Sequence, residues 1–155
     1  MRACLRVVML SLAAGVGVAG LPAGAQAQRN DGTSMIDILG KTFGADTIIE
    51  NQNKEIVRME MDIVSDSKES FRMLTDRWTY GIVALGDSRI AQIHLSIYRE
   101  LDGNWSLVTE STNDGTLALV TVTPQSTARY RFVVSVPRFN ESYTAGHYSL
   151  IIYHN

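Results

Sequence analysis

The chain has 155 residues, of which 45% are hydrophobic and 19% are charged, and its formal net charge is −2 at pH 7. This length suits a single domain, and the apolar share excludes an intrinsically disordered protein. The slight acidic excess argues against a nucleic-acid partner, because binding to phosphates requires a basic surface.

The first 27 residues have the composition of a secretory signal peptide. Arg2 and Arg6 make a positive N-terminal region, and an apolar run extends from Val7 to Leu21. The small residues of Ala25-Gln26-Ala27 then match the site that a signal peptidase cleaves. We expect cleavage after Ala27 and export of the remaining chain to the periplasm or the exterior. A retained membrane anchor is the alternative.

The mature chain that this cleavage would release contains 12 Lys and Arg against 16 Asp and Glu, a net charge of −4. It contains no cysteine, because Cys4 lies in the leader. A disulfide, a thiolate metal site and a cysteine nucleophile are therefore excluded from it. No later segment is long and apolar enough to span a membrane.

Residues 28–33 are polar and predict a flexible lead-in. Apolar side chains then recur at helical spacing, at Met35, Ile36, Leu39 and Phe43. Thr33 or Ser34 can serve as the N-cap, and Gly44 suits the position after the last turn. The pattern predicts one short amphipathic helix over about residues 34–44.

From Glu55 onward apolar and polar residues alternate, which is typical of strands with one buried face. Two turn sequences, Asp102-Gly103-Asn104 and Asn113-Asp114-Gly115, predict hairpins. The predicted strands cover residues 55–63, 71–74, 78–85, 92–98, 105–109, 117–123, 129–136 and 147–153. Eight strands without interspersed helices predict an all-β fold, an antiparallel and jelly-roll-like β-sandwich that forms a single domain over residues 34–155.

The alternation also predicts which side chains face the core of the sandwich. Successive side chains of a strand point to opposite faces, so the apolar set of each strand belongs inside. The predicted inward-facing residues are Val57, Met59, Met61, Ile93, Leu95, Ile97, Val120, Val122, Phe132, Val134, Tyr148 and Leu150.

Four pieces of sequence between residues 69 and 153 carry a resemblance to a known family. They are Phe71 to Tyr80, Ile93 to Tyr98 with Asp102-Gly103-Asn104, Val120 to Pro124 with Ala128-Arg129-Tyr130, and Ala145 to Leu150. Together they resemble the bacterial pre-peptidase C-terminal domain, which implies a jelly-roll-like β-sandwich of a secreted protein. Members accompany secreted proteases or bind extracellular polymers. Gln92 and His94 stand where the family has an acidic pair, so carboxylates that could help hold calcium are missing.

The histidines His94, His147 and His154 are the first candidates for catalysis or metal binding. No two of them have a spacing typical of metal ligands, and no HExxH or GxSxG motif occurs. A two-histidine site formed by His94 and His147 is an alternative if the fold brings their strands together. Otherwise we expect no catalytic residue, no bound metal and no cofactor.

Aromatic side chains on strands and turns are the best candidates for binding, because they offer flat amphipathic surfaces. Trp105 leads because it directly follows a predicted turn, and Tyr98, His94 and His147 are further candidates. The predicted function is an exported, non-catalytic binding or accessory domain for a protein, an envelope component or a polysaccharide. A small secreted hydrolase with a site assembled from loops, and an accessory or inhibitory subunit of an exported enzyme, are the alternatives.

Overall fold

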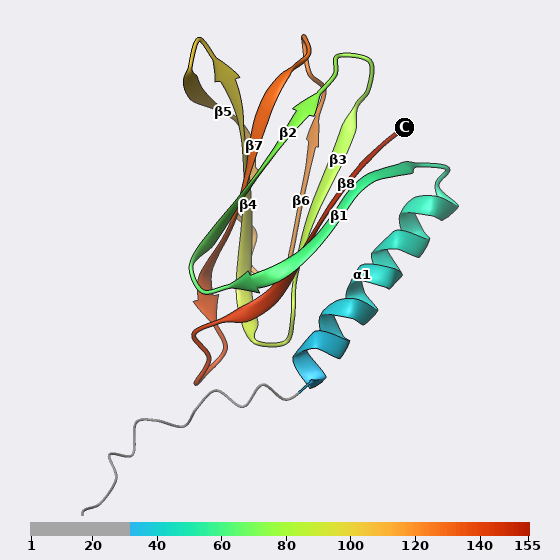
Figure 1. Ribbon diagram of the computed structural model, residues 1–155. Helices are drawn as coiled ribbons and strands as arrows, with labels where there is room; N and C mark the ends of the chain where they lie inside the picture. Colours follow the sequence, from blue (N-terminus) through green and yellow to red (C-terminus); the bar gives the residue numbers. More distant parts are fainter. Residues whose placement is uncertain (1–31) are drawn as a thin grey trace, which may run out of the picture.

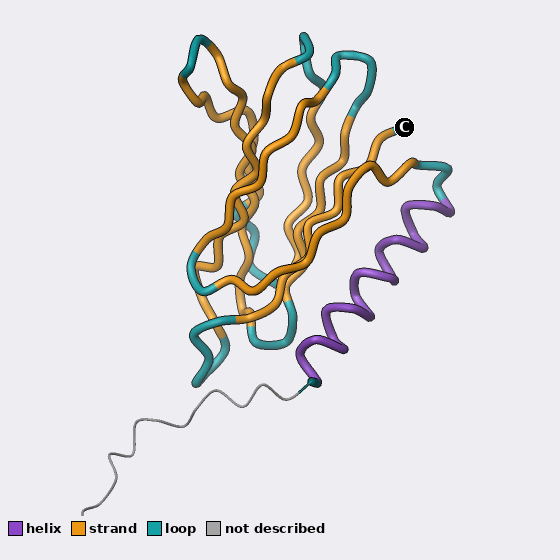
Figure 2. Tube along the Cα trace, viewed as in Figure 1, coloured by secondary structure: helices purple, strands orange, loops and turns teal. Residues whose placement is uncertain are grey.

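The computed structural model describes residues 32–155, so the predicted leader, its cleavage site and most of the lead-in lie outside the described residues. Two layers of strands face each other, and a helix lies along the outside of one layer (Figure 1, Figure 2). The elements are α1 (Thr33–Asn51), β1 (Glu55–Val64), β2 (Ser67–Leu74), β3 (Tyr80–Gly86), β4 (Ile90–Leu101), β5 (Asn104–Ser111), β6 (Leu117–Val122), β7 (Ala128–Phe139) and β8 (Gly146–His154). This arrangement confirms the predicted all-β sandwich with one N-terminal helix. Within residues 32–155, no helix has the length and apolar character needed to cross a membrane.

The strands form two four-stranded sheets, named here sheet A, with the order β1-β8-β3-β6, and sheet B, with the order β2-β7-β4-β5. All neighbouring strands are antiparallel. The predicted β4–β5 hairpin is confirmed, with positive φ angles of 49° at Asp102 and 78° at Gly103. The second predicted hairpin is wrong, because residues 113–115 join β5 of sheet B to β6 of sheet A. A turn sequence specifies a change of direction but not whether the strands on either side pair.

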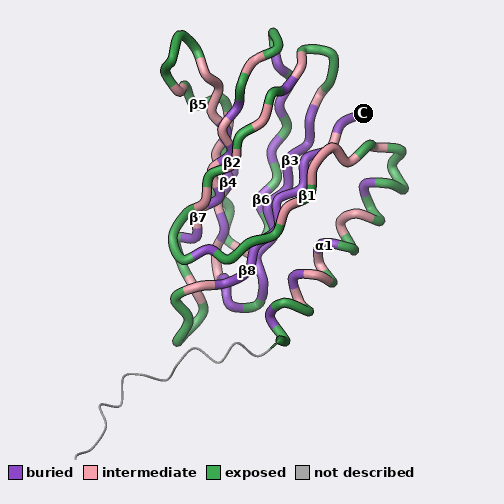
Figure 3. Tube along the Cα trace, viewed as in Figure 1, coloured by how far each residue is buried: buried purple, intermediate pink, exposed green. Residues whose placement is uncertain are grey.

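The main core lies between the two sheets. Leu95, Ile97, Phe132 and Leu150 are completely buried in it. The predicted inward positions are confirmed on β4, β6, β7 and β8, where buried and more exposed residues alternate or the whole strand is covered (Figure 3). The period of two therefore placed nine of the nineteen buried residues of the main core correctly.

On β1 the predicted inward positions Met59 and Met61 are wrong. Ile56 pairs with Tyr153 and Arg58 pairs with Ile152, so Val57 is an extra residue that forms a β-bulge. Every later side chain of β1 consequently changes face. Met59 and Met61 lie on the outer side and are 37% and 42% exposed. The charged residues that alternate with them, Arg58, Glu60 and Asp62, line a cleft between the sheets.

Helix α1 packs on the outer face of sheet A and is longer than the predicted helix over residues 34–44. Its buried residues Ile38 and Ile49 contact a second apolar cluster formed by Val83, Leu85 and Ile151. This packing continues past Gly44, so tertiary contacts outweigh the cost of about 1 kcal/mol for an interior glycine. The opposite side of the helix is exposed (Figure 3).

Candidate functional site

Three of the four predicted site residues lie on the outer face of sheet B. His94 and Tyr98 are on β4, between the buried residues of that strand, and Trp105 is on the neighbouring strand β5. His147 is elsewhere, near the start of β8 in sheet A, and is only 6% exposed. The fold therefore does not bring His94 and His147 together, and the two-histidine site is wrong.

Tyr98 and Trp105 belong to a set of stacked side chains named here the aromatic–arginine cluster, which comprises Phe71, Tyr98, Trp105, Arg129 and Arg131. The guanidinium carbon of Arg131 lies 4.5 Å from the ring centroid of Tyr98 and 5.1 Å from that of Trp105. The guanidinium carbon of Arg129 lies 4.8 Å from the Phe71 ring and 5.9 Å from the Trp105 ring. These distances are typical of cation–π contacts. The Phe71 and Trp105 rings also meet, with their centroids 5.6 Å apart.

Strand register builds this cluster. Strand β7 lies between β2 and β4, and its Arg131 pairs with Phe71 on one side and with Tyr98 on the other. Arg129 and Arg131 alternate with buried neighbours, so both arginines point outward. Sequence reasoning missed Phe71 and the two arginines. The alternation around Tyr130 and Phe132 was a signal that could have placed the arginines on the exposed face.

Each arginine of the cluster has one carboxylate partner. Arg131 Nη1 lies 3.3 Å from Glu69 Oε1, and Arg129 Nη1 lies 3.9 Å from Glu100 Oε2. Such partly exposed pairs contribute little to stability. Arg131 Nε is buried and has no hydrogen-bond acceptor among residues 32–155. The Arg131 guanidinium group therefore has one N–H donor that these residues leave unused.

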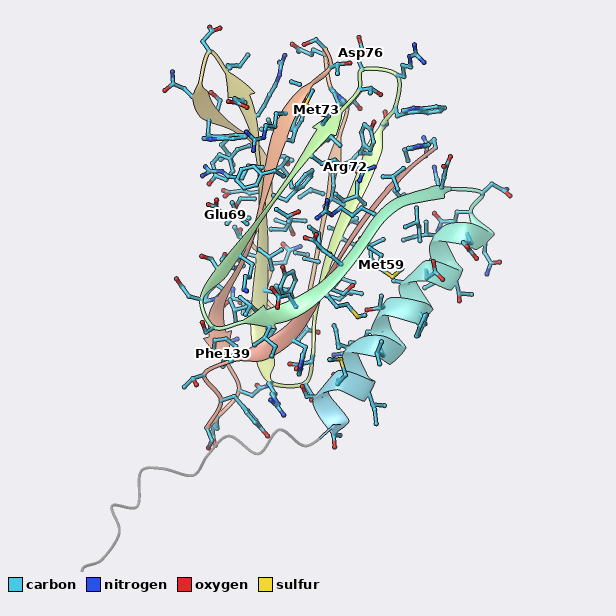
Figure 4. The ribbon with its side chains drawn as sticks, in the orientation of Figure 1. Met59, Glu69, Arg72, Met73, Asp76 and Phe139 are labelled. Atoms are coloured by element: carbon cyan, nitrogen blue, oxygen red, sulfur yellow. The ribbon has the colours of Figure 1, made fainter. Side chains whose placement is uncertain are left out.

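Apolar side chains lie on the same face as the cluster. Met73 is 54% exposed and Leu107 is 51% exposed, and Phe71 of the cluster itself is 39% exposed. Figure 4 shows Met73 and Glu69 on β2, the strand that carries Phe71. The outer face of sheet B therefore combines exposed apolar groups with two cations.

A serine, an aspartate and a histidine also meet, at the N-terminal end of α1. Ser34 Oγ donates a hydrogen bond to Asp87 Oδ2 at 2.5 Å and lies 2.6 Å from His147 Nδ1. Asp87 Oδ2 lies 3.2 Å from the same ring nitrogen and also accepts the backbone N–H of His147 at 2.8 Å. We name these three residues the Ser34–Asp87–His147 clamp. It ties α1 to the β3–β4 turn and to β8.

The geometry of the clamp differs from that of a hydrolytic triad. In a triad, the serine and the carboxylate bind opposite nitrogens of the imidazole, so the serine can pass its proton to the ring. Here both groups contact Nδ1, and the serine hydroxyl is already donated to the carboxylate. All three side chains are buried, with Ser34 only 2% exposed. The arrangement is suited to holding α1 and not to attack on a substrate.

Electrostatics support this structural role. Burial acts to raise the pKa of Asp87, but hydrogen bonds from Ser34 and from the backbone N–H groups of His147 and Arg89 outweigh it. The pKa of Asp87 is therefore lower than its ordinary value of 3.8. Asp87 remains ionised as the central acceptor of the clamp.

An open cleft of about 450 Å³ lies between the neighbouring edges β1 and β2. Its charged groups are paired within the chain, with Arg58 Nη2 2.6 Å from Glu60 Oε2 and Lys68 Nζ 2.8 Å from Asp62 Oδ2. Burial, together with the charges of Glu60 and Asp62, raises the pKa of Tyr148 at the cleft to about 12. Over residues 32–155, no three His, Cys, Asp or Glu residues are grouped so that they could hold a metal ion.

Comparisons with known proteins add little to this geometry. No family model matches the chain, and no curated protein matches it. Among solved structures it is similar to a protein of Sulfurospirillum deleyianum, with 10% identity, a TM-score of 0.43, and coverage of 63% of this chain and 98% of that one. It is also similar to the Yersinia pseudotuberculosis-derived mitogen, with 15% identity, a TM-score of 0.37, and coverage of 61% and 82%. Likeness at this level carries no argument about function.

Proposed function

We propose that this protein is an exported, non-catalytic binding domain that recognises a protein through the outer face of sheet B. The observation that carries the proposal is the aromatic–arginine cluster with its exposed apolar surroundings. Trp, Tyr, Phe, Met and Arg are the residue types enriched at the centres of protein–protein interfaces. Their rings are already held in place by cation–π contacts, so little side-chain entropy is lost when a partner binds.

A protein is favoured over a polysaccharide because the Trp105 ring is not a free platform. Two guanidinium groups lie within 6 Å of its centroid, and the Phe71 ring meets it at 52°. Stacking of a sugar ring needs an open aromatic face, whereas a protein partner can supply carboxylates to the arginines and apolar groups to Met73 and Leu107. A polysaccharide ligand remains an outcome that the experiment below can detect.

The binding role is also favoured over the hydrolase alternative. The Ser34–Asp87–His147 clamp has a serine, a histidine and a carboxylate, but its contacts converge on one ring nitrogen and its groups are buried. An accessory role is a special case of the proposal, in which the protein partner is itself an exported enzyme.

Site-specific photo-crosslinking in the producing cells tests the binding face. A photo-reactive amino acid at Met73 or at Leu107 is expected to give an adduct with the same discrete protein. The same probe at Leu119, an exposed residue of β6 in sheet A, is the control and should give none. Arg131→Glu, which reverses a cluster charge, should abolish the adducts while leaving the circular dichroism spectrum unchanged.

Equal adducts from Leu119, or none from either sheet B position, would contradict a protein-binding face there. A second experiment tests whether the ligand is a polysaccharide. A purified Trp78→Phe variant is titrated with soluble polysaccharides while its Trp fluorescence is measured. Trp105 is the only tryptophan of that variant, so a saturable fluorescence change would assign the face to a polysaccharide.

The export part of the proposal rests on the leader sequence. The protein recovered from the periplasm or the medium is expected to begin at Gln28, after the Ala-Gln-Ala site. Intact-mass spectrometry measures this directly. A chain that keeps residues 1–27 and stays in the membrane fraction would refute it.

A further inference from the structure

Strand β1 is an edge of sheet A whose outer face is apolar and only partly covered by α1. It pairs with β8 on one side only, and no strand among residues 32–155 pairs with its other side. Because of the bulge at Val57, its outward residues are Met59, Met61 and Ile63, which are 37%, 42% and 48% exposed. Figure 4 shows Met59 on the side of β1 that faces α1. Exposed apolar rows on an edge strand favour pairing with another chain.

Helix α1 extends this apolar surface. Thr42 Oγ1 lies 3.8 Å from the sulfur of Met61, so the Thr42 side of the helix faces β1. Lys41, on the other side, donates to the carbonyl of Gly86 at the end of β3. With 3.6 residues per turn, Met35, Leu39 and Phe43 fall on the Thr42 side. Met35 is 43% exposed and Phe43 is 61% exposed, so one continuous apolar surface runs from the helix to β1.

We propose that this surface binds a second copy of the chain, through antiparallel pairing of β1 with β1 about a two-fold axis. Pairing of the two edges satisfies the free backbone groups of both strands and joins the two A sheets into one eight-stranded sheet. The two α1 helices then lie on the same face of that sheet. Closed two-fold pairing uses the same patch on both copies and leaves neither β1 edge free.

The charges of β1 select one register. With Met59 opposite Met59 of the partner subunit, Arg58 faces Glu60 of the partner subunit, and the same pair occurs twice. A shift by two residues places either Glu60 or Arg58 opposite its own copy, and like charges directly opposite are destabilising. A shift by one residue places methionine opposite charged side chains. Charged side chains on an edge strand commonly prevent pairing with another chain. Here Arg58 and Glu60 disfavour the shifted registers and favour the register with Met59 opposite Met59 of the partner subunit.

The spacing of the helices fits the apolar side chains between them. Adjacent strands are about 4.8 Å apart, so two helices centred over the β8 strands would lie about 14 Å apart. Helices in direct contact are about 8–10 Å apart. The remaining space suits the long side chains of Met59, Met61 and Phe43 from both copies. Formation of the two-fold dimer therefore buries both the apolar residues of β1 and the apolar side of α1.

Sedimentation velocity over a concentration series tests the pairing. The purified protein is expected to dimerise, and Arg58→Glu or Glu60→Arg alone should each raise the dissociation constant about tenfold, because two cross-strand attractions become repulsions. The double variant Arg58→Glu/Glu60→Arg exchanges the charges and should return the constant to within about threefold of the original. Arg138→Glu, an exposed charge reversal on β7 of sheet B, is the matched control and should change nothing.

A cysteine at the two-fold axis tests the register. In a Cys4→Ser background, Met59→Cys should form an interchain disulfide under mild oxidation, because paired Cα atoms of antiparallel strands lie within disulfide range. A protein that is monomeric at every concentration would overturn the proposal. So would a dimer whose dissociation constant is the same in both single charge variants, or one in which Met59→Cys forms no crosslink. None of these outcomes bears on the ligand-binding face of sheet B.

Discussion

Replacement of Asp87 with alanine is expected to lower the free energy of unfolding by about 3–5 kcal/mol, the scale for removing one partner from a buried charged cluster. The change leaves the Ser34 hydroxyl and the backbone N–H groups of Arg89 and His147 without their acceptor. Denaturant unfolding followed by circular dichroism measures the loss. Asp114→Ala, in an exposed turn, is the control and should change stability by less than about 0.5 kcal/mol.

The same carboxylate makes stability depend on pH. The pKa of Asp87 is lower in the folded protein than its ordinary value of 3.8, so its contribution is complete above that value and is lost as the pH falls through the folded pKa. The stability difference between the original protein and Asp87→Asn should therefore narrow between about pH 5 and pH 2. A constant difference over this range, or a loss below about 1 kcal/mol in Asp87→Ala, would show that the clamp does not hold α1.

Leu95→Ala is expected to lower the free energy of unfolding by about 2–5 kcal/mol, the range for a leucine truncated in a rigid core. Leu95 is completely buried between the sheets, and β7 and β5 hold its strand on both sides, so the surroundings cannot collapse easily into the cavity. Chemical denaturation gives the value. Leu119→Ala, on the exposed face of β6, removes the same atoms and should cost less than about 0.5 kcal/mol. Equal losses in the two variants would contradict the inward position of Leu95.

The fold was predictable from the sequence wherever the alternation of apolar and polar residues followed directly from the burial of one strand face. Alternation placed the core residues of β4, β6, β7 and β8, because these strands have one face in the main core or are covered on both. It failed at β1, where a single bulged residue, Val57, reverses the faces without any change in the pattern. It also gave too short a helix, because the contacts that extend α1 beyond Gly44 come from β3 and β8.

The candidate site was predictable only in part, and for a similar reason. Trp105 and Tyr98 stood out as aromatic residues near a turn. Phe71 and Arg131 belong to the same cluster because β7 lies between β2 and β4, which is a property of the strand order and not of nearby residues. Thr33 or Ser34 was expected to cap α1, but Gly32 takes that position, and Ser34 binds groups distant in sequence.

The separation of the clamp partners along the chain has a consequence for how the protein reaches its final form. Ser34 is 53 residues from Asp87 and 113 residues from His147. A ribosome that has made α1 must still make nearly all the remaining chain before β8 exists to receive the helix. Contacts between distant residues form late, because the intervening loop must first be closed. Among the described elements α1 is therefore made first, but the surface that it packs on is complete only when β8 has been made.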